Sequence, residues 1–190
     1  DLHQPVVVTN VGGAGGMVGA RQVAAAAPDG HTLLMHHLGL SLAPSLFRDA
    51  RLDPVESFAH VGLAAEQPMV LMGSRSLAPR DIGQLVSWVR ANGEKATMAS
   101  AGLGSGTHLC AMLFEAATNV RVTTVQYRGS APAYADVASG RVDLLCDGAG
   151  SGIEQSRSGT VNAFLVTGPR RLEGLPSVPS AAEAGLERLV

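Results

Sequence analysis

Short apolar runs alternate with helix-like segments along this chain, and glycine-rich loops stand at several of the junctions. The runs that predict β-strands are residues 6–9, 32–35, 96–100, 122–126, 142–146 and 161–167, with two short strands in 61–72 broken near Pro68. Helices are predicted at residues 17–27, 80–91, 130–140 and 180–185, with two more that open after glycine-rich loops and end near Asn119 and Ser158. This alternation predicts an α/β fold with a largely parallel sheet.

The length and composition suit a folded protein. A chain of 190 residues can form one large domain or two small lobes, and 46% hydrophobic with 16% charged residues argues against disorder. The net charge of −2 and the scattered cations give no basic field, so we expect no nucleic-acid partner. No apolar run reaches the roughly 20 residues that a membrane span needs. Because the chain starts at Asp1 without a methionine or a leader, we expect a processed chain or a fragment.

A Gly/Ser loop is the first candidate functional feature. Residues 99–109 read Ala-Ser-Ala-Gly-Leu-Gly-Ser-Gly-Thr-His-Leu and pass from a strand through a loop into a helix. In parallel sheets, ligands bind at the carboxyl ends of strands, where such loops lie. The first backbone N–H groups of a helix have no partner within the helix, and they lie at the positive end of its dipole. The loop therefore predicts a site for a small anion that needs no charged side chain.

Two other segments follow predicted strands and so belong to the same edge of the sheet. Tyr127-Arg128-Gly129 ends one strand, and Arg128 there is either a contact for an acidic ligand or a solvated loop cation. Asp147 ends another strand, where it either accepts from a ligand amine or hydroxyl or caps the next helix.

Enzyme functions fit less well. Ser105 and His108 suggest a serine hydrolase, yet in Gly-Leu-Gly-Ser-Gly the serine stands one place too late for G-x-S-x-G. His108 in a first helical turn more often caps or packs than acts as a base. The glycine cluster near Gly13 fails the dinucleotide pattern because the third glycine falls at Val18. We therefore expect no catalytic residue and no cofactor.

The histidines and cysteines show no metal-binding spacing, so no metal site is expected. His36 and His37 end a predicted strand, where neighbours point to opposite faces, and we interpret the pair as structural or variable rather than as a joint ligand site. Cys110 and Cys146 are either two small buried side chains or a disulfide, because the sequence does not give their separation.

Several ordered motifs together resemble one family. They are Asn-Val-Gly-Gly-Ala-Gly-Gly-Met-Val-Gly (10–19), Ala-Pro-Asp-Gly-His-Thr-Leu-Leu (27–34), the 99–109 loop, Tyr-Arg-Gly-Ser-Ala-Pro-Ala (127–133), Val-Thr-Gly (166–168) and Leu-Pro-Ser-Val-Pro-Ser-Ala-Ala-Glu-Ala-Gly (175–185). Nearly the whole chain resembles the Bug family, the solute receptors of tripartite tricarboxylate transporters.

The resemblance implies a periplasmic binding protein with two Rossmann-like α/β lobes, whose cleft closes over a small carboxylate. It assigns residues 1–98 and 167–190 to the first lobe and 99–166 to the second, with crossover strands near 96–100 and 162–167. It implies that backbone N–H groups and waters hold the ligand, and that the partners are the membrane subunits of the transporter. The implied ligand-binding residues are Ala101, Gly102, Gly104, Ser105, Gly106, Thr107, His108, Tyr127, Arg128, Gly129 and Asp147.

The chain departs from the family pattern at a few points. Val11-Gly12 stands where the family has Arg-Pro, and Leu103 replaces a commonly polar residue of the anion loop. Family members also extend beyond both ends, so we expect an incomplete first lobe that exposes a strand edge. Such a lobe is unstable alone or pairs with a second molecule, whereas the second lobe folds well. A truncated, non-functional remnant is the remaining alternative to a receptor.

Overall fold

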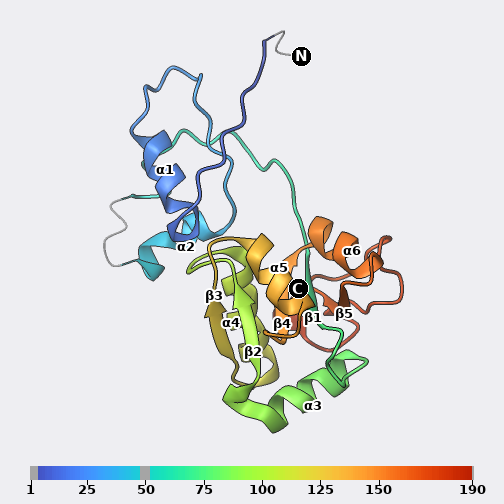
Figure 1. The fold of residues 1–190 in the computed structure, drawn as a ribbon. Helices are drawn as coiled ribbons and strands as arrows, with labels where there is room; N and C mark the ends of the chain where they lie inside the picture. Colours follow the sequence, from blue (N-terminus) through green and yellow to red (C-terminus); the bar gives the residue numbers. More distant parts are fainter. Residues whose placement is uncertain (1–3, 48–51, 190) are drawn as a thin grey trace.

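A computed structural model describes residues 4–47 and 52–189, and it centres on one open five-stranded sheet (Figure 1). The strand order is β3-β2-β4-β1-β5. The strands are β1 (Met69–Ser74), β2 (Thr97–Ser100), β3 (Thr123–Gln126), β4 (Leu144–Gly148) and β5 (Val161–Val166). The α/β class expected from the alternation is confirmed.

Strand directions in the sheet are mixed. β2 runs parallel to both β3 and β4, whereas β1 is antiparallel to its neighbours β4 and β5. The expectation of a largely parallel sheet is therefore wrong for β1. The reason is that apolar periodicity reports burial of a strand, and it does not report the direction in which the strand enters the sheet.

Helices cover both faces of the sheet, so the strands alternate between two cores. One core joins Leu71, Met98, Leu144 and Cys146 to α3 (Ile82–Asn92) and α4 (Gly106–Thr118). The other joins strand neighbours such as Val70, Ala99 and Leu145 to α5 (Ser130–Ala138) and α6 (Ala149–Arg157). This two-residue period is the one that a strand buried on both sides requires.

Local signals explain where α3 and α4 begin and end. The Asp81 carboxylate caps α3 by accepting from the Gln84 N–H at 2.8 Å, and Gly93 ends the helix with φ +56°. Ser105 caps α4 by accepting from the His108 N–H at 3.3 Å, and Asn119 ends it in the left-handed region. A 3₁₀ turn, η2 (Gly93–Lys95), leads from α3 into β2.

The amino-terminal segment forms a smaller unit beside the sheet (blue to cyan in Figure 1). It contains the 3₁₀ turn η1 (Ala14–Gly16), α1 (Met17–Ala24) and α2 (Gly39–Leu46). A small core of Met17, Ala20, Ala43 and Leu52 joins these helices. The carboxyl-terminal segment packs on the sheet instead, where Ala181 and, from the 3₁₀ turn η3 (Glu187–Leu189), Leu189 enter the α3–α4 core.

Some predicted elements are absent from the described residues. Residues 6–9 and 32–35 form no strand, and Val7 and Met35 are 85% and 82% exposed. Of the two strands expected in 61–72, only β1 forms, and the helix expected at 180–185 is replaced by a β-bridge at Ser180 and turns at 181–185. Conversely, α2 forms in a region whose sequence signals are mixed. A strand requires a hydrogen-bonding neighbour, and residues 6–9 and 32–35 have none here.

Cys110 of α4 and Cys146 of β4 form a disulfide, which decides between the two readings of the sequence. Their Cα atoms lie 6.1 Å apart, and both side chains are buried. The bond closes a segment in which the two cysteines are 36 positions apart. It joins a helix to the strand beneath it within the α3–α4 core.

The predicted boundary between lobes, at residues 98 and 99, falls within β2. The sheet contains strands from both sides of that boundary, and the division into lobes remains a prediction. Among residues 4–47 and 52–189, no helix has the length and apolar character needed to cross a membrane.

Candidate functional site

The predicted site segments meet at one edge of the sheet. Because β2, β3 and β4 are parallel, their carboxyl ends lie together. The loop 101–105 leaves β2, the turn 127–129 leaves β3, and Asp147 stands near the end of β4. The structure thus brings all three segments to the same edge.

Hydroxyl groups inside the loop close it on itself. Thr107 Oγ1 accepts from the Ala101 N–H at 2.7 Å and lies 2.8 Å from Ser105 Oγ. Both side chains are buried, and Ser105 Oγ also caps α4. Gly102 and Gly104 take φ values of +127° and +78°, which let the chain fold back within so few residues. Ser105 and Thr107 therefore shape the loop with their side chains.

Most N–H groups of the loop are already used. The Ser105 N–H donates to the Gly102 carbonyl, and the Gly104 N–H reaches His108 Nδ1 at 3.4 Å. The N–H groups of Leu103, Gly106 and Thr107 donate to no described residue. Two of these are the first two amides of α4, where the helix dipole is positive. This corner is therefore suited to hold an acceptor such as a carboxylate oxygen.

Backbone hydrogen bonds fix the 127–129 turn against the loop. The Tyr127 N–H donates to the Ser100 carbonyl at 2.7 Å, and the Gly129 N–H donates to the Ala101 carbonyl at 3.3 Å. The Tyr127 hydroxyl donates to Asp136 at 2.7 Å, and Arg141 pairs with the same carboxylate. Arg128 is exposed, and its side chain bonds to no described residue.

Burial raises the pKa of Tyr127, and the hydrogen bond and charge of Asp136 add to the effect. Burial likewise raises the pKa of Tyr134, with a further contribution from the charge of Asp147. Asp147 Oδ1 accepts from the Gly148 N–H at 2.8 Å. Gly148 is the N-cap of α6, which has no side-chain cap among the described residues, so Asp147 does not serve the capping use that the sequence left open. The Asp147 side chain at this edge suits a hydroxyl or amine of a ligand better than its acid group.

The amino-terminal segment touches the anion loop through glycines. A Cβ on Gly15 would lie 2.5 Å from the Leu103 carbonyl oxygen, and one on Gly39 would lie 2.3 Å from that of Gly104. Phe47 covers Gly104 from the same side. The sequence reading did not find this contact. For Gly15 the available signal was the glycine cluster near Gly13, because glycines permit a close approach between two backbones.

His36 and His37 differ from the sequence interpretation. They do not follow a strand, and their rings lie together with centroids 4.6 Å apart. His37 Nδ1 accepts from the Gly39 N–H at 2.9 Å, and partial burial of its ring, with the charge of His36, lowers its pKa. The expectation of opposite faces is therefore wrong, because it assumed an extended strand.

The geometry gives the hydrolase alternative no nucleophile–base pair. Ser105 Oγ contacts Thr107 Oγ1 and the backbone N–H of His108, while His108 Nδ1 faces the Gly104 N–H. Between Ser105 and the His108 ring, the described structure contains no hydrogen bond. Within its described ranges the chain also holds no group of three metal-ligating side chains.

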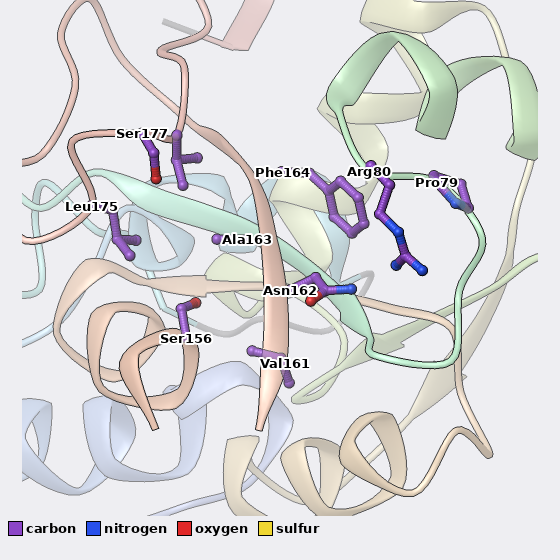
Figure 2. A pocket seen from close by; sticks show the side chains of 10 residues that line it. Pro79, Arg80, Ser156, Val161, Asn162, Ala163, Phe164, Leu175 and Ser177 are labelled. Carbon is purple, nitrogen blue, oxygen red and sulfur yellow. The ribbon is translucent and has the colours of Figure 1, made fainter. Parts of the chain in front are cut away.

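A cavity of about 260 Å³ lies away from these loops, beside β5 (Figure 2). Val161 and Asn162 at the amino end of β5 line it, together with Phe164 and Arg80. The amino end of β5 lies at the sheet edge opposite the anion loop, because β4 and β5 both run antiparallel to β1. None of the predicted site residues lines this cavity.

Comparisons with known proteins identify the same family that the sequence motifs resemble. Residues 1–190 match the family described as "Tripartite tricarboxylate transporter family receptor" (TctC). A protein of Agrobacterium vitis from the TAR-I ttuE-ttuC' intergenic region is 39% identical over 98% of this chain and 54% of its own length. The chain thus spans about half the length of this curated relative.

Three solved structures share the fold. The periplasmic binding protein BugD has a TM-score of 0.89 at 39% identity, covering 95% of this chain and 60% of that one. MatC from Rhodopseudomonas palustris with bound malate gives 0.90 at 34% identity, with 99% and 64% covered. The R. palustris protein Rpa4515 with adipate gives 0.91 at 32%, with 97% and 62% covered. The chain belongs to the TctC family of tripartite tricarboxylate transporter receptors, in which the Bug proteins fall.

Proposed function

We propose that this chain is the ligand-capturing part of a receptor for a small carboxylate. The observation that carries the proposal is the start of α4, where the amides of Gly106 and Thr107 have no described acceptor. A carboxylate oxygen satisfies such amides and interacts favourably with the helix dipole. Support also comes from MatC and Rpa4515, which carry malate and adipate in their structures.

The proposed ligand contacts divide into two groups. The amides of Gly106 and Thr107 bind the acid group, and exposed Arg128 approaches it from the neighbouring turn with Gly129. Asp147 faces a hydroxyl or amine of the ligand. The side chains of Ser105, Thr107 and Tyr127 hold the loops in place, and His108 orients the Gly104 amide.

In the proposed role the receptor binds its ligand and catalyses no reaction. It captures its acid in the periplasm and presents both lobes, residues 1–98 with 167–190 and residues 99–166, to the membrane subunits of a transporter. Use of the complex in sensing is the other role open to a binding protein. The Cys110–Cys146 disulfide supports the compartment, because disulfides persist where the environment is oxidising.

The test is a thermal-shift screen of the full-length protein with malate, adipate and other small acids, with the corresponding diamides as neutral controls. An acid present at 100 times its dissociation constant should stabilise by about 2.7 kcal/mol, and its diamide should not. If no acid shifts the unfolding temperature, the capture proposal fails. An electrophilic serine probe should leave Ser105 unlabelled, whereas labelling that Ser105→Ala abolishes would favour the hydrolase.

We also propose that the 190-residue chain associates with itself. Val6, Val7 and Val8 are 71–85% exposed, and Val61 and Leu63 are 90% and 78% exposed. Exposed apolar segments with free backbone groups pair readily with another chain. Sedimentation of the 190-residue chain over a concentration series should show a mass that rises with concentration. A monomer at every concentration would contradict this proposal.

A further inference from the structure

The Cys110–Cys146 disulfide lies directly beneath the candidate carboxylate site. Cys110 follows Gly106 by four residues, so it stands one turn below the uncommitted amide on the same side of α4. Cys146 immediately precedes Asp147 at the end of β4. One covalent bond therefore connects the two elements that carry the acid-binding amides and the Asp147 carboxylate.

Polar contacts hold the two ends of α4 very differently. At the carboxyl end, Arg90 donates to the Thr118 carbonyl, Arg188 to the Ala116 carbonyl, and the Val122 N–H to the Glu115 carboxylate. At the amino end, the described hydrogen bonds of residues 101–108 stay within the loop and α4 itself, apart from one to the Ala101 carbonyl from the Gly129 N–H. None of them reaches β4. There, only apolar packing and the disulfide join α4 to the sheet.

The sequence of the loop explains why the disulfide matters for the positions of the amides. Gly102, Gly104 and Gly106 supply three glycines within five residues, and glycine has more backbone freedom to lose than any other residue. A loop this rich in glycine is flexible, so it does not by itself fix the positions of the two amides. Those positions become fixed only if the first turn of α4 is held against the sheet. Fixing a binding group beforehand raises affinity because less freedom is lost when the ligand binds.

We propose that the Cys110–Cys146 disulfide is a positioning element of the carboxylate site, which holds the first turn of α4 in place against the end of β4. The inference rests on the proposed function. It goes beyond stabilisation, because a bond that only stabilises the fold leaves the affinity of the folded protein unchanged. The dissociation constant of the folded protein therefore separates the two roles.

The experiment compares malate and adipate binding by calorimetry in full-length protein, well below the unfolding temperature. Cys110→Ala with Cys146→Val removes the bond while keeping apolar side chains of similar size. The expected result is affinity weaker by about five- to tenfold, mostly through faster dissociation. Leu85→Ala is the matched control, because it removes a buried side chain of the same core from α3, an element that carries none of the proposed ligand contacts. It should lower stability and leave the affinity unchanged.

A second measurement covers the case in which the double variant does not fold. Wild-type protein is reduced with a phosphine under conditions that keep its circular dichroism native, and is then reoxidised. Affinity should fall on reduction and return on reoxidation. Unchanged affinity in the reduced or the substituted protein overturns the inference while leaving the receptor function intact. Failure of oxidised wild type to bind either acid overturns the receptor function instead.

Discussion

Thr107 holds the anion loop closed by accepting a hydrogen bond from the Ala101 N–H, six residues earlier, at 2.7 Å. Its hydroxyl is buried and also lies 2.8 Å from Ser105 Oγ, so two sides of the loop depend on one oxygen. A buried amide that loses its acceptor carries the full cost of desolvation. The shape of the loop therefore depends on this side chain more than on any charge.

Thr107→Val tests that dependence because valine keeps the branched shape and removes the oxygen. We expect the free energy of unfolding to fall by about 0.5–1.5 kcal/mol, since the half-buried Ala101 N–H loses its acceptor. Thr107→Ser, which keeps the oxygen, should lose less. Urea denaturation followed by circular dichroism measures both. Equal stability of the valine variant and wild type would show that the hydrogen bond from the Ala101 N–H to Thr107 does not contribute to stability.

Two variants at Ser105 should affect the stability of the fold and the affinity for the acid differently. Ser105→Ala should lower stability by about 0.5–2 kcal/mol, because the cap of α4 is lost. Ser105→Asp should retain the cap, since Asp is an equally good N-cap residue. Its charge, however, lies beside the proposed acid site and should weaken malate binding. Thermal unfolding and calorimetry on the same samples give the two readouts, and undiminished binding by the Asp variant would argue against an acid at this helix end.

The disulfide should also contribute to global stability. For cysteines 36 positions apart, the chain-entropy model predicts a contribution of about 3–4 kcal/mol. Denaturation of the Cys110→Ala, Cys146→Val protein, compared with oxidised wild type, measures it. A loss much below 1 kcal/mol would mean that the unfolded chain is already restricted without the bond.

The two tyrosines predict the behaviour at alkaline pH. Tyr127 and Tyr134 are the only tyrosines, and burial together with Asp136 and Asp147 raises both pKa values above the usual 10. A raised pKa in the folded state means that this contribution to stability is present below pH 10 and is lost as the pH rises through the folded pKa values. Absorbance at 295 nm should show no tyrosinate in the native protein near pH 10.

Urea-unfolded protein is the control for that titration, because both phenols should then titrate near pH 10. Tyr127→Phe should halve the absorbance change and release Asp136 from one of its two partners. Native protein that forms tyrosinate at the same pH as unfolded protein would contradict the burial of both rings.

The sequence predicts most elements of the five-stranded sheet and the helices that cover it, because the signals for these elements lie within the segments themselves. Pro79 and the spacing of Ile82, Leu85 and Val89 place α3, and the short apolar runs place β2, β3, β4 and β5. By contrast, the valines of residues 6–8 and the leucines of 33–34 have the composition of strands, yet they form none here. Strand formation depends on a neighbouring strand, which is a property of the surrounding fold rather than of the segment.

The sequence predicts where the site residues lie in the fold, but it does not predict which hydrogen bonds their side chains make. From the sequence alone, the rule that ligands bind at carboxyl ends of strands places the 101–108 loop, Tyr127–Gly129 and Asp147 at one edge of the sheet. It did not show that the hydroxyls of Ser105, Thr107 and Tyr127 are already occupied, because their partners follow from turn geometry and from Asp136 on another element. Nor did it show the contact between Gly39 and Gly104, which are 65 positions apart in the chain.

Gly106 offers a matched pair of variants that tests whether the first amides of α4 bind the acid. Gly106 is the first helical residue, where proline is well tolerated, and the extended ψ of 160° at Ser105 suits a following proline. A Cβ at Gly106 would lie 3.6 Å from the nearest atom, of Met69, so alanine fits as well. Only the proline removes the N–H group.

The decisive measurement is therefore the dissociation constant of malate and adipate for full-length wild type, Gly106→Ala and Gly106→Pro. We predict that the alanine variant binds as wild type does, and that the proline variant binds about tenfold or more weakly, as expected for the loss of one hydrogen bond to a charged group. Equal affinity of the alanine and proline variants, with both folded, would contradict the assignment of the acid to the start of α4.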